Sequence, residues 1–168
     1  AEAEAEAGAG AGAEAEAEAE AEAVAPGPAE PEAEPEPAGP RFATPETATR
    51  WLDAERANLV AAAHLAATGS PEHAIGLSAA LGPYLDAHAH YHDAHVLHDL
   101  ALRAASVTGD RAAAARANGL FATACGRLGD YQGALRHHRE ALEIHRGTGN
   151  RSGVAAALHG LALTCWRL

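Results

Sequence analysis

The stretch DAHAHYHDAHVLHD, residues 86–99, carries five histidines in fourteen residues. Imidazole nitrogens bind transition metals and exchange protons near neutral pH, so this stretch could form a metal site or take part in catalysis. Zinc sites usually combine histidine with paired cysteines or with an HExxH helix, and the sequence contains neither pattern. Whether the rings converge on one point depends on the elements that carry them.

Residues 1–40 differ in composition from the rest of the chain. They contain twelve Glu and no basic residue, whereas residues 41–168 contain eleven acidic and twelve basic residues. Alternating Glu and Ala would place like charges at i and i+4 of a helix, and the Pro-rich end favours an extended chain. We therefore expect residues 1–40 to form a disordered acidic linker and residues 41–168 to form a nearly neutral folded domain.

The composition also excludes several kinds of protein. No apolar run is long enough to span a membrane, and the first residues lack the basic and apolar regions of a secretory signal. Cys125 and Cys165 cannot form a disulfide framework, so a reducing cytoplasm fits best. The near-neutral charge of the folded part indicates no direct binding of nucleic acid. Because the sequence lacks Met, we expect a fragment or a processed piece of a longer protein.

A pattern of residues recurs every forty positions along the folded part. Thr-Gly pairs begin at positions 68, 108 and 148, and each interval holds two apolar-periodic segments separated by a short break. The aligned columns are Trp51, Tyr91 and Tyr131; Ala54, Ala94 and Ala134; Ala61, Ala101 and Ala141; Leu81, Phe121 and Leu161; and Cys125 with Cys165. Such self-similarity is typical of a repeat architecture.

The sequence predicts an all-α fold of about six helices, near residues 46–67, 72–88, 91–107, 111–128, 131–147 and 151–168. A hairpin of two helices must bury its apolar face against the next hairpin, so we expect a right-handed α-solenoid. Its units would span about 41–70, 71–110, 111–150 and, in part, 151–168. Turns are expected near Gly69, Ala89, Gly109, Gly129 and Gly149. The last helix would have no neighbour on its apolar face.

The segment GRLGDYQGALRHHREALEI, residues 126–144, resembles a tetratricopeptide repeat (TPR). Gly129 stands at the turn between helices, Tyr131 begins the second helix, and Ala134 and Ala141 stand at the small crossing positions. The resemblance implies binding of a protein or peptide partner without catalysis. The interval of forty exceeds the usual TPR period of about thirty-four, so a HEAT-like architecture stays the alternative.

The segment FATPETATRWLDAERANLVAAAHLAATG, residues 42–69, is similar to the entry helix of the repeats in bacterial STAND-type regulators with NB-ARC ATPase domains. That family includes antibiotic-regulatory transcription factors, in which the repeats sense a ligand or partner and restrain the ATPase. The resemblance implies a role in signal transduction and transcriptional regulation, with the ATPase domain as a suspected partner. A stand-alone TPR adaptor is the alternative, and a His-based metal-binding protein is a distant one.

The repeat register assigns a position to each histidine of residues 86–99. His98 aligns with His138 and is expected to pack between helices, and His95 is expected to be half-buried. The others should lie at a helix end or face solvent: His88, His90 and His92. Because the rings diverge over two helices and a turn, we expect structural histidines, and we predict no metal site and no cofactor.

The first helix of each hairpin lines the concave face of such a solenoid. In this register six side chains point there: Arg116, Thr123, Arg127, His159, Trp166 and Arg167. Arg127 and Arg167 form a repeated column, and paired guanidinium groups beside an aromatic residue suit an acidic peptide or another anion. The two cysteines share a first-helix column and should be small, buried groups. No nucleophile has a nearby base and acid, so no catalytic residue is predicted.

Overall fold

The computed structural model describes residues 39–168, so the predicted acidic linker lies outside the described residues except for its last two positions. The six helices are α1 (Pro45–Gly69), α2 (Pro71–Ala87), α3 (Tyr91–Thr108), α4 (Arg111–Arg127), α5 (Tyr131–Gly147) and α6 (Arg151–Arg167). No strand occurs in the described residues, and the all-α prediction is confirmed. None of the helices found there is long and apolar enough to cross a membrane.

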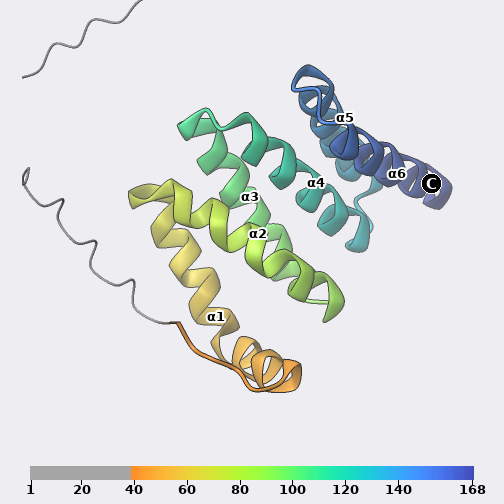
Figure 1. Cartoon of the computed structure of the whole chain (residues 1–168). Helices are drawn as coiled ribbons and strands as arrows, with labels where there is room; N and C mark the ends of the chain where they lie inside the picture. The colour runs from red at the N-terminus through yellow and green to blue at the C-terminus, as the bar shows by residue number, and fades with distance from the viewer. Residues whose placement is uncertain (1–38) are drawn as a thin grey trace, which may run out of the picture. The chain divides into compact units, whose positions relative to one another are not determined.

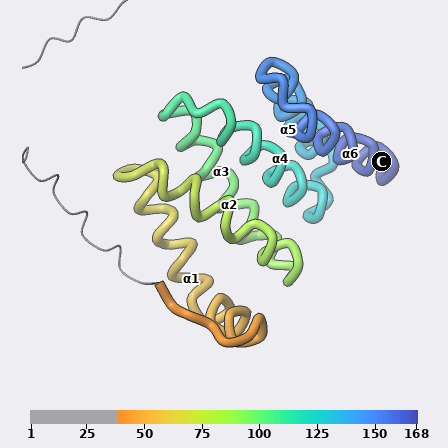
Figure 2. The backbone as a smooth tube through the Cα atoms, in the orientation of Figure 1, coloured from red at the N-terminus to blue at the C-terminus, as the bar shows by residue number. Residues whose placement is uncertain are grey.

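The helices follow one another in chain order as a row (Figure 1). Each helix packs on the next, and further contacts join α1 to α3, α2 to α4 and α4 to α6. The helices α1 and α6 do not touch, and the backbone tube shows them at opposite ends of the row (Figure 2). This arrangement confirms the expected solenoid of helical hairpins.

The turns between helices use left-handed backbone at recurring positions. Gly109, Gly129 and Gly149 have φ of 71°, 86° and 67°, and Ala89 has φ of 59°. Glycine adopts such angles without the steric penalty of a Cβ, which explains the Thr-Gly pairs that begin at positions 108 and 148. The turn predicted near Gly69 is confirmed, but its backbone differs from that of the others. Gly69 is the last residue of α1, and the single residue Ser70, with φ of −148°, links α1 to α2 without a left-handed residue.

Polar side chains cap the helices that follow the three glycine turns. Asp110, Asp130 and Asn150 each accept a hydrogen bond from the backbone N–H three residues later, at 2.8–2.9 Å. Thr44 caps α1 in a capping box with Thr47, as the Thr-Pro start of that helix indicates. The caps satisfy N–H groups that helix geometry leaves free, and they place each helix start at a fixed distance after its glycine.

Small side chains lie where the paired helices approach each other. The crossing alanines are each 3% exposed or less: Ala94, Ala101, Ala134 and Ala141. A Cβ built on Gly126 of α4 would stand 3.7 Å from the Ala134 Cβ of α5, an ordinary contact distance. The backbones of α4 and α5 are therefore held together by a contact that has room only for small groups.

Replacing Ala134 by Leu should separate α4 from α5, because added methylene groups in a packed interface cost about 1–3 kcal/mol. Gln132→Leu changes an exposed position on the same helix and should leave the melting temperature nearly unchanged. Thermal unfolding followed by circular dichroism compares the two variants. Equal melting temperatures would show that the repeat register is misplaced.

Candidate functional site

A groove of about 500 Å³ runs between α4 and α6, and α5 contributes to its lining. Five of the six side chains expected on the concave face line it: Arg116, Thr123, Arg127, His159 and Arg167. Trp166 does not line the groove, and its side chain is 81% exposed on the last turn of α6. Small residues form part of the wall: Gly119 of α4, where a Cβ would meet nothing within 4 Å, and the exposed Ala156 of α6.

The groove has a one-sided charge. Its ionisable lining residues are basic or histidine, apart from the Tyr131 phenol: Arg116, Arg127, Arg167, His138, His145 and His159. No carboxylate is among its lining residues. A concave surface with one sign of charge concentrates ligands of the opposite sign.

Arg127 is already paired inside the protein. Its Nε and Nη2 donate to the two carboxylate oxygens of Asp86 at 2.9 and 3.2 Å, and its guanidinium carbon lies 5.7 Å from the Tyr91 ring centroid. The hydrogen bond to Asp86 raises the pKa of Arg127 above its ordinary value. This fork links α2 to α4, so the charge of Arg127 is largely neutralised by its own chain.

Arg167 occupies the same column one repeat later and lacks this partner. The residue forty positions after Asp86 is Gly126, which has no carboxylate, whereas the position of Tyr91 is again a tyrosine, Tyr131. Within the described residues, no ion pair includes Arg116 or Arg167. The repeat therefore leaves the Arg167 guanidinium without the internal acceptor that neutralises Arg127.

His98 is buried between helices, as the register predicts. It is 2% exposed, and its Nδ1 shares a hydrogen bond of 2.8 Å with the Ser78 hydroxyl of α2. Burial, with a smaller contribution from the charge of His95, lowers the pKa of His98 to about 4. The ring therefore stays neutral at physiological pH and acts as a packing group with one hydrogen bond.

His138 is the equivalent ring in the next repeat, and it lies at the groove. Asn118, which stands where the first repeat has Ser78, bonds to His137 at 2.9 Å, and the buried His138 Nδ1 has no hydrogen-bond partner. The ring lies against Gly160 of α6, where even a Cβ would collide with it. Burial, and then the charge of His137, lower the pKa of His138.

The other histidines of residues 86–99 follow the register except for His90. His95 is half-buried against Phe121, with ring centroids 4.6 Å apart, and His92 is exposed, as predicted. The expectation that His90 faces solvent is wrong. Its Nε2 lies 2.8 Å from Arg56 Nη1 of α1, because the turn between α2 and α3 packs beside that helix. His88 caps the C-terminal end of α2.

In the part of the chain that the structure describes, no three His, Cys, Asp or Glu side chains lie close enough together to hold a metal ion. The rings of His88 and His90 lie near each other, with centroids 6.4 Å apart. Beside them, the Tyr84 hydroxyl of α2 donates a hydrogen bond to Asp53 of α1. These groups join α1 to α2 in a hydrogen-bonded cluster.

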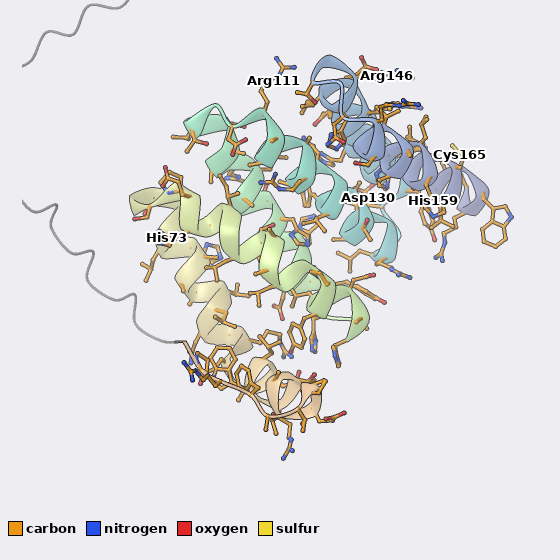
Figure 3. The ribbon with its side chains drawn as sticks, viewed as in Figure 1. His73, Arg111, Asp130, Arg146, His159 and Cys165 are labelled. Carbon is orange, nitrogen blue, oxygen red and sulfur yellow. The ribbon has the colours of Figure 1, made fainter. Side chains whose placement is uncertain are left out.

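The two cysteines of the shared column differ in burial. Cys125 of α4 is 2% exposed and desolvation raises the pKa of its thiol. Cys165 of α6 is exposed (Figure 3), which corrects the expectation that both are buried. The reason is that α5 covers this face of α4, whereas no helix of residues 39–168 covers the corresponding face of α6.

Comparison with known families places the groove within a recognised repeat. The tetratricopeptide repeat family matches residues 110–168, from the N-cap of α4 to the end of the chain. Residues 110–168 carry a tetratricopeptide repeat. No curated protein and no solved structure matches the chain. The repeat comprises α4, α5 and α6, the three helices that contribute nearly all of the groove, and repeats of this kind suggest a protein-interaction module.

The depressed pKa of His98 predicts acid-sensitive stability. The pKa is about 4 in the folded protein, against an ordinary value of 6.5 for the unfolded chain, so only the unfolded chain gains this proton as pH falls from 6.5 to 4. The stabilisation that comes from the neutral His98 is fully present above pH 6.5. It should fall by on the order of 3 kcal/mol in total as the pH is lowered from 6.5 to 4. Urea unfolding at a series of pH values measures the slope.

Substitutions at two histidines separate this effect from general acid sensitivity. His98→Asn should flatten part of the slope, because it removes one of the titrating groups. His92→Gln, at an exposed ring, should leave the slope unchanged. A stability that does not vary between pH 6.5 and 4, or an equal effect of the two variants, would contradict the burial of His98.

Proposed function

We propose that residues 41–168 bind an acidic segment of a partner protein in the groove between α4 and α6. The observation that carries this proposal is the lining of the groove, which holds three arginines and no carboxylate. Arg127 donates two hydrogen bonds to Asp86, and Arg167 lacks such an acceptor. A carboxylate of the partner would accept the equivalent pair of hydrogen bonds from Arg167. Such bidentate pairs add both energy and orientation.

The shape of the groove supports the same proposal. Gly119 of α4 and the exposed Ala156 of α6 line the two walls, and a Cβ at Gly119 would meet nothing within 4 Å, so an extended peptide can lie close to both helices there. Thr123 and Thr164 donate their hydroxyls to carbonyls of their own helices, which leaves their oxygens free to accept only. The arginines are therefore the principal donors available to a ligand, and acidic side chains or a terminal carboxylate are the groups that fit them.

The test uses the full chain and a fluorescently labelled Glu-rich peptide, with fluorescence anisotropy as the measurement. Arg167→Gln should raise the dissociation constant about tenfold, since a hydrogen bond to a charged group contributes roughly 1.5–3 kcal/mol. Gly126→Asp should have a similar effect although Arg167 is still present. It supplies the carboxylate that Asp86 supplies to Arg127, and a Cβ at this position meets only an ordinary contact.

Two controls define the outcome. Arg139→Gln removes the same charge at an exposed position of α5 outside the groove lining, so it should change affinity little. A peptide with Gln in place of Glu should bind much more weakly. Equal binding of the two peptides, or an equal loss from Arg139→Gln and Arg167→Gln, would show that the groove does not recognise carboxylates.

For the wider context, we infer that this segment acts inside a larger cytoplasmic STAND-type regulator, where the repeats restrain an NB-ARC ATPase and thereby a transcriptional output. The support is the resemblance of residues 42–69 to the entry helix of such repeats. That stretch contains α1, which has 25 residues where α2 and α4 have 17 each. A stand-alone adaptor is the second candidate. Translating the gene upstream of Ala1 separates the two, since a GxxxxGK[ST] motif supports the regulator and its absence supports the adaptor.

A further inference from the structure

A small cavity one repeat earlier corresponds to part of the groove. It has a volume of about 20 Å³ and is formed by α2, α3 and α4. Its lining residues are Gly82, Asp86, Tyr91, Ala94, His98, Leu120, Thr123 and Ala124. Seven of the eight residues forty positions later line the groove: Ala122, Gly126, Tyr131, His138, Gly160, Leu163 and Thr164. The groove of about 500 Å³ therefore includes an enlarged counterpart of this cavity.

Two side chains of the protein itself fill the earlier site. One is Leu120, whose Cδ2 lies 3.2 Å from the point where a Cβ on Gly82 would stand, with the His98 Cε1 at 3.3 Å from the same point. The other is Asp86, whose carboxylate accepts two hydrogen bonds from Arg127. An aliphatic group and a carboxylate thus close the space between α2 and α4.

Both of these residues are replaced by glycine in the later repeat. Gly160 stands at the position of Leu120, and Gly126 stands at the position of Asp86. Gly160 has no side chain that could reach across to α4, and the ring of His138 lies against it. The Nδ1 of this buried ring has no hydrogen-bond partner. The later repeat therefore lacks both of the groups that fill the earlier one.

We propose that the acidic segment of the partner supplies both missing groups, with an aliphatic side chain in the space beside Gly160 and a carboxylate on Arg167. This inference rests on the proposed function of the groove and specifies the segment that binds there. Leu163 of α6 lines the groove, is 46% exposed and would be the principal apolar contact of that side chain. The equivalent residues of α2 and α4, Pro83 and Thr123, are exposed as well, so this position is open in all three first helices.

The separation of the two contacts sets the spacing within the partner. Leu163 stands four residues before Arg167 on the same face of α6, where Cβ atoms are about 5–6 Å apart. In an extended segment, side chains two residues apart point to the same side and are separated by about 6.6 Å, whereas adjacent side chains point to opposite sides. The segment therefore carries Leu, Ile or Val two positions from Glu or Asp.

Fluorescence anisotropy with the full chain tests this spacing on three labelled peptides. The first repeats the sequence Glu-Ser-Leu-Ser, in which every Leu is two positions from a Glu in both directions. It should bind about tenfold more tightly than the second peptide, Glu-Ser-Ala-Ser, because part of a leucine side chain is buried in the groove. The third peptide, Glu-Leu-Ser-Ser, has the composition and charge of the first but adjacent Glu and Leu, and it should bind no better than the second.

A pair of leucine variants locates the aliphatic side chain on the protein. Leu163→Ala should abolish most of the difference between the first and second peptides and change the affinity for the second peptide little. Leu158→Ala is the matched control, because Leu158 is also 46% exposed on α6 but does not line the groove, so the difference should persist. Alanine is the best helix former, so circular dichroism should show that both variants are folded.

The outcomes distinguish this inference from the proposed function. Equal affinity for the three peptides, lowered by Arg167→Gln, would overturn the aliphatic contact and leave the recognition of carboxylates intact. A preference for the first peptide that survives Leu163→Ala, or that Leu158→Ala reduces equally, would also overturn the aliphatic contact. Absence of binding by all three peptides would contradict both proposals.

Discussion

Close contact between consecutive helices at small side chains is the interaction on which the rest of this structure depends. The chain has only two Phe, two Trp and three Tyr, so large side chains contribute little to its core. Alanine buries little area, and it stabilises a pair of helices only if their backbones come close enough for many weak contacts. Each hairpin by itself therefore contributes little to the free energy of unfolding, and the packing of neighbouring hairpins contributes the rest.

The same constraint accounts for the site. Equivalent residues of successive repeats lie at the same position along their helices. Arg127 and Arg167 are such a pair, and their surroundings are therefore nearly the same. A function can then arise where one repeat lacks what the previous one has. Asp86 neutralises Arg127, and Gly126 leaves Arg167 open. Cys125 and Cys165 also occupy equivalent positions, and the different helix contacts around them explain why Cys125 is buried and Cys165 is exposed.

Sequence reasoning located the helices to within two residues at every end, since glycine, capping residues and apolar spacing are local signals that recur at each repeat. It located His98 and His138 in the core for the same reason. It failed where a contact joins different elements: the fork from Arg127 to Asp86 spans 41 positions, and the bond from Arg56 to His90 spans 34. Five of the six side chains expected on the concave face line the groove, and Trp166 does not, but the sequence did not indicate which of the groove's charges are already paired.

Thiol accessibility tests the central claim that cover by a neighbouring helix, and not residue type, decides what each column does. Cys125 and Cys165 are the only thiols and share one column. In dilute native protein, an aromatic disulfide reagent should react rapidly with one thiol, identified by mass spectrometry as Cys165, and with Cys125 only after denaturation. Rapid reaction of both thiols, or protection of both, would contradict the account.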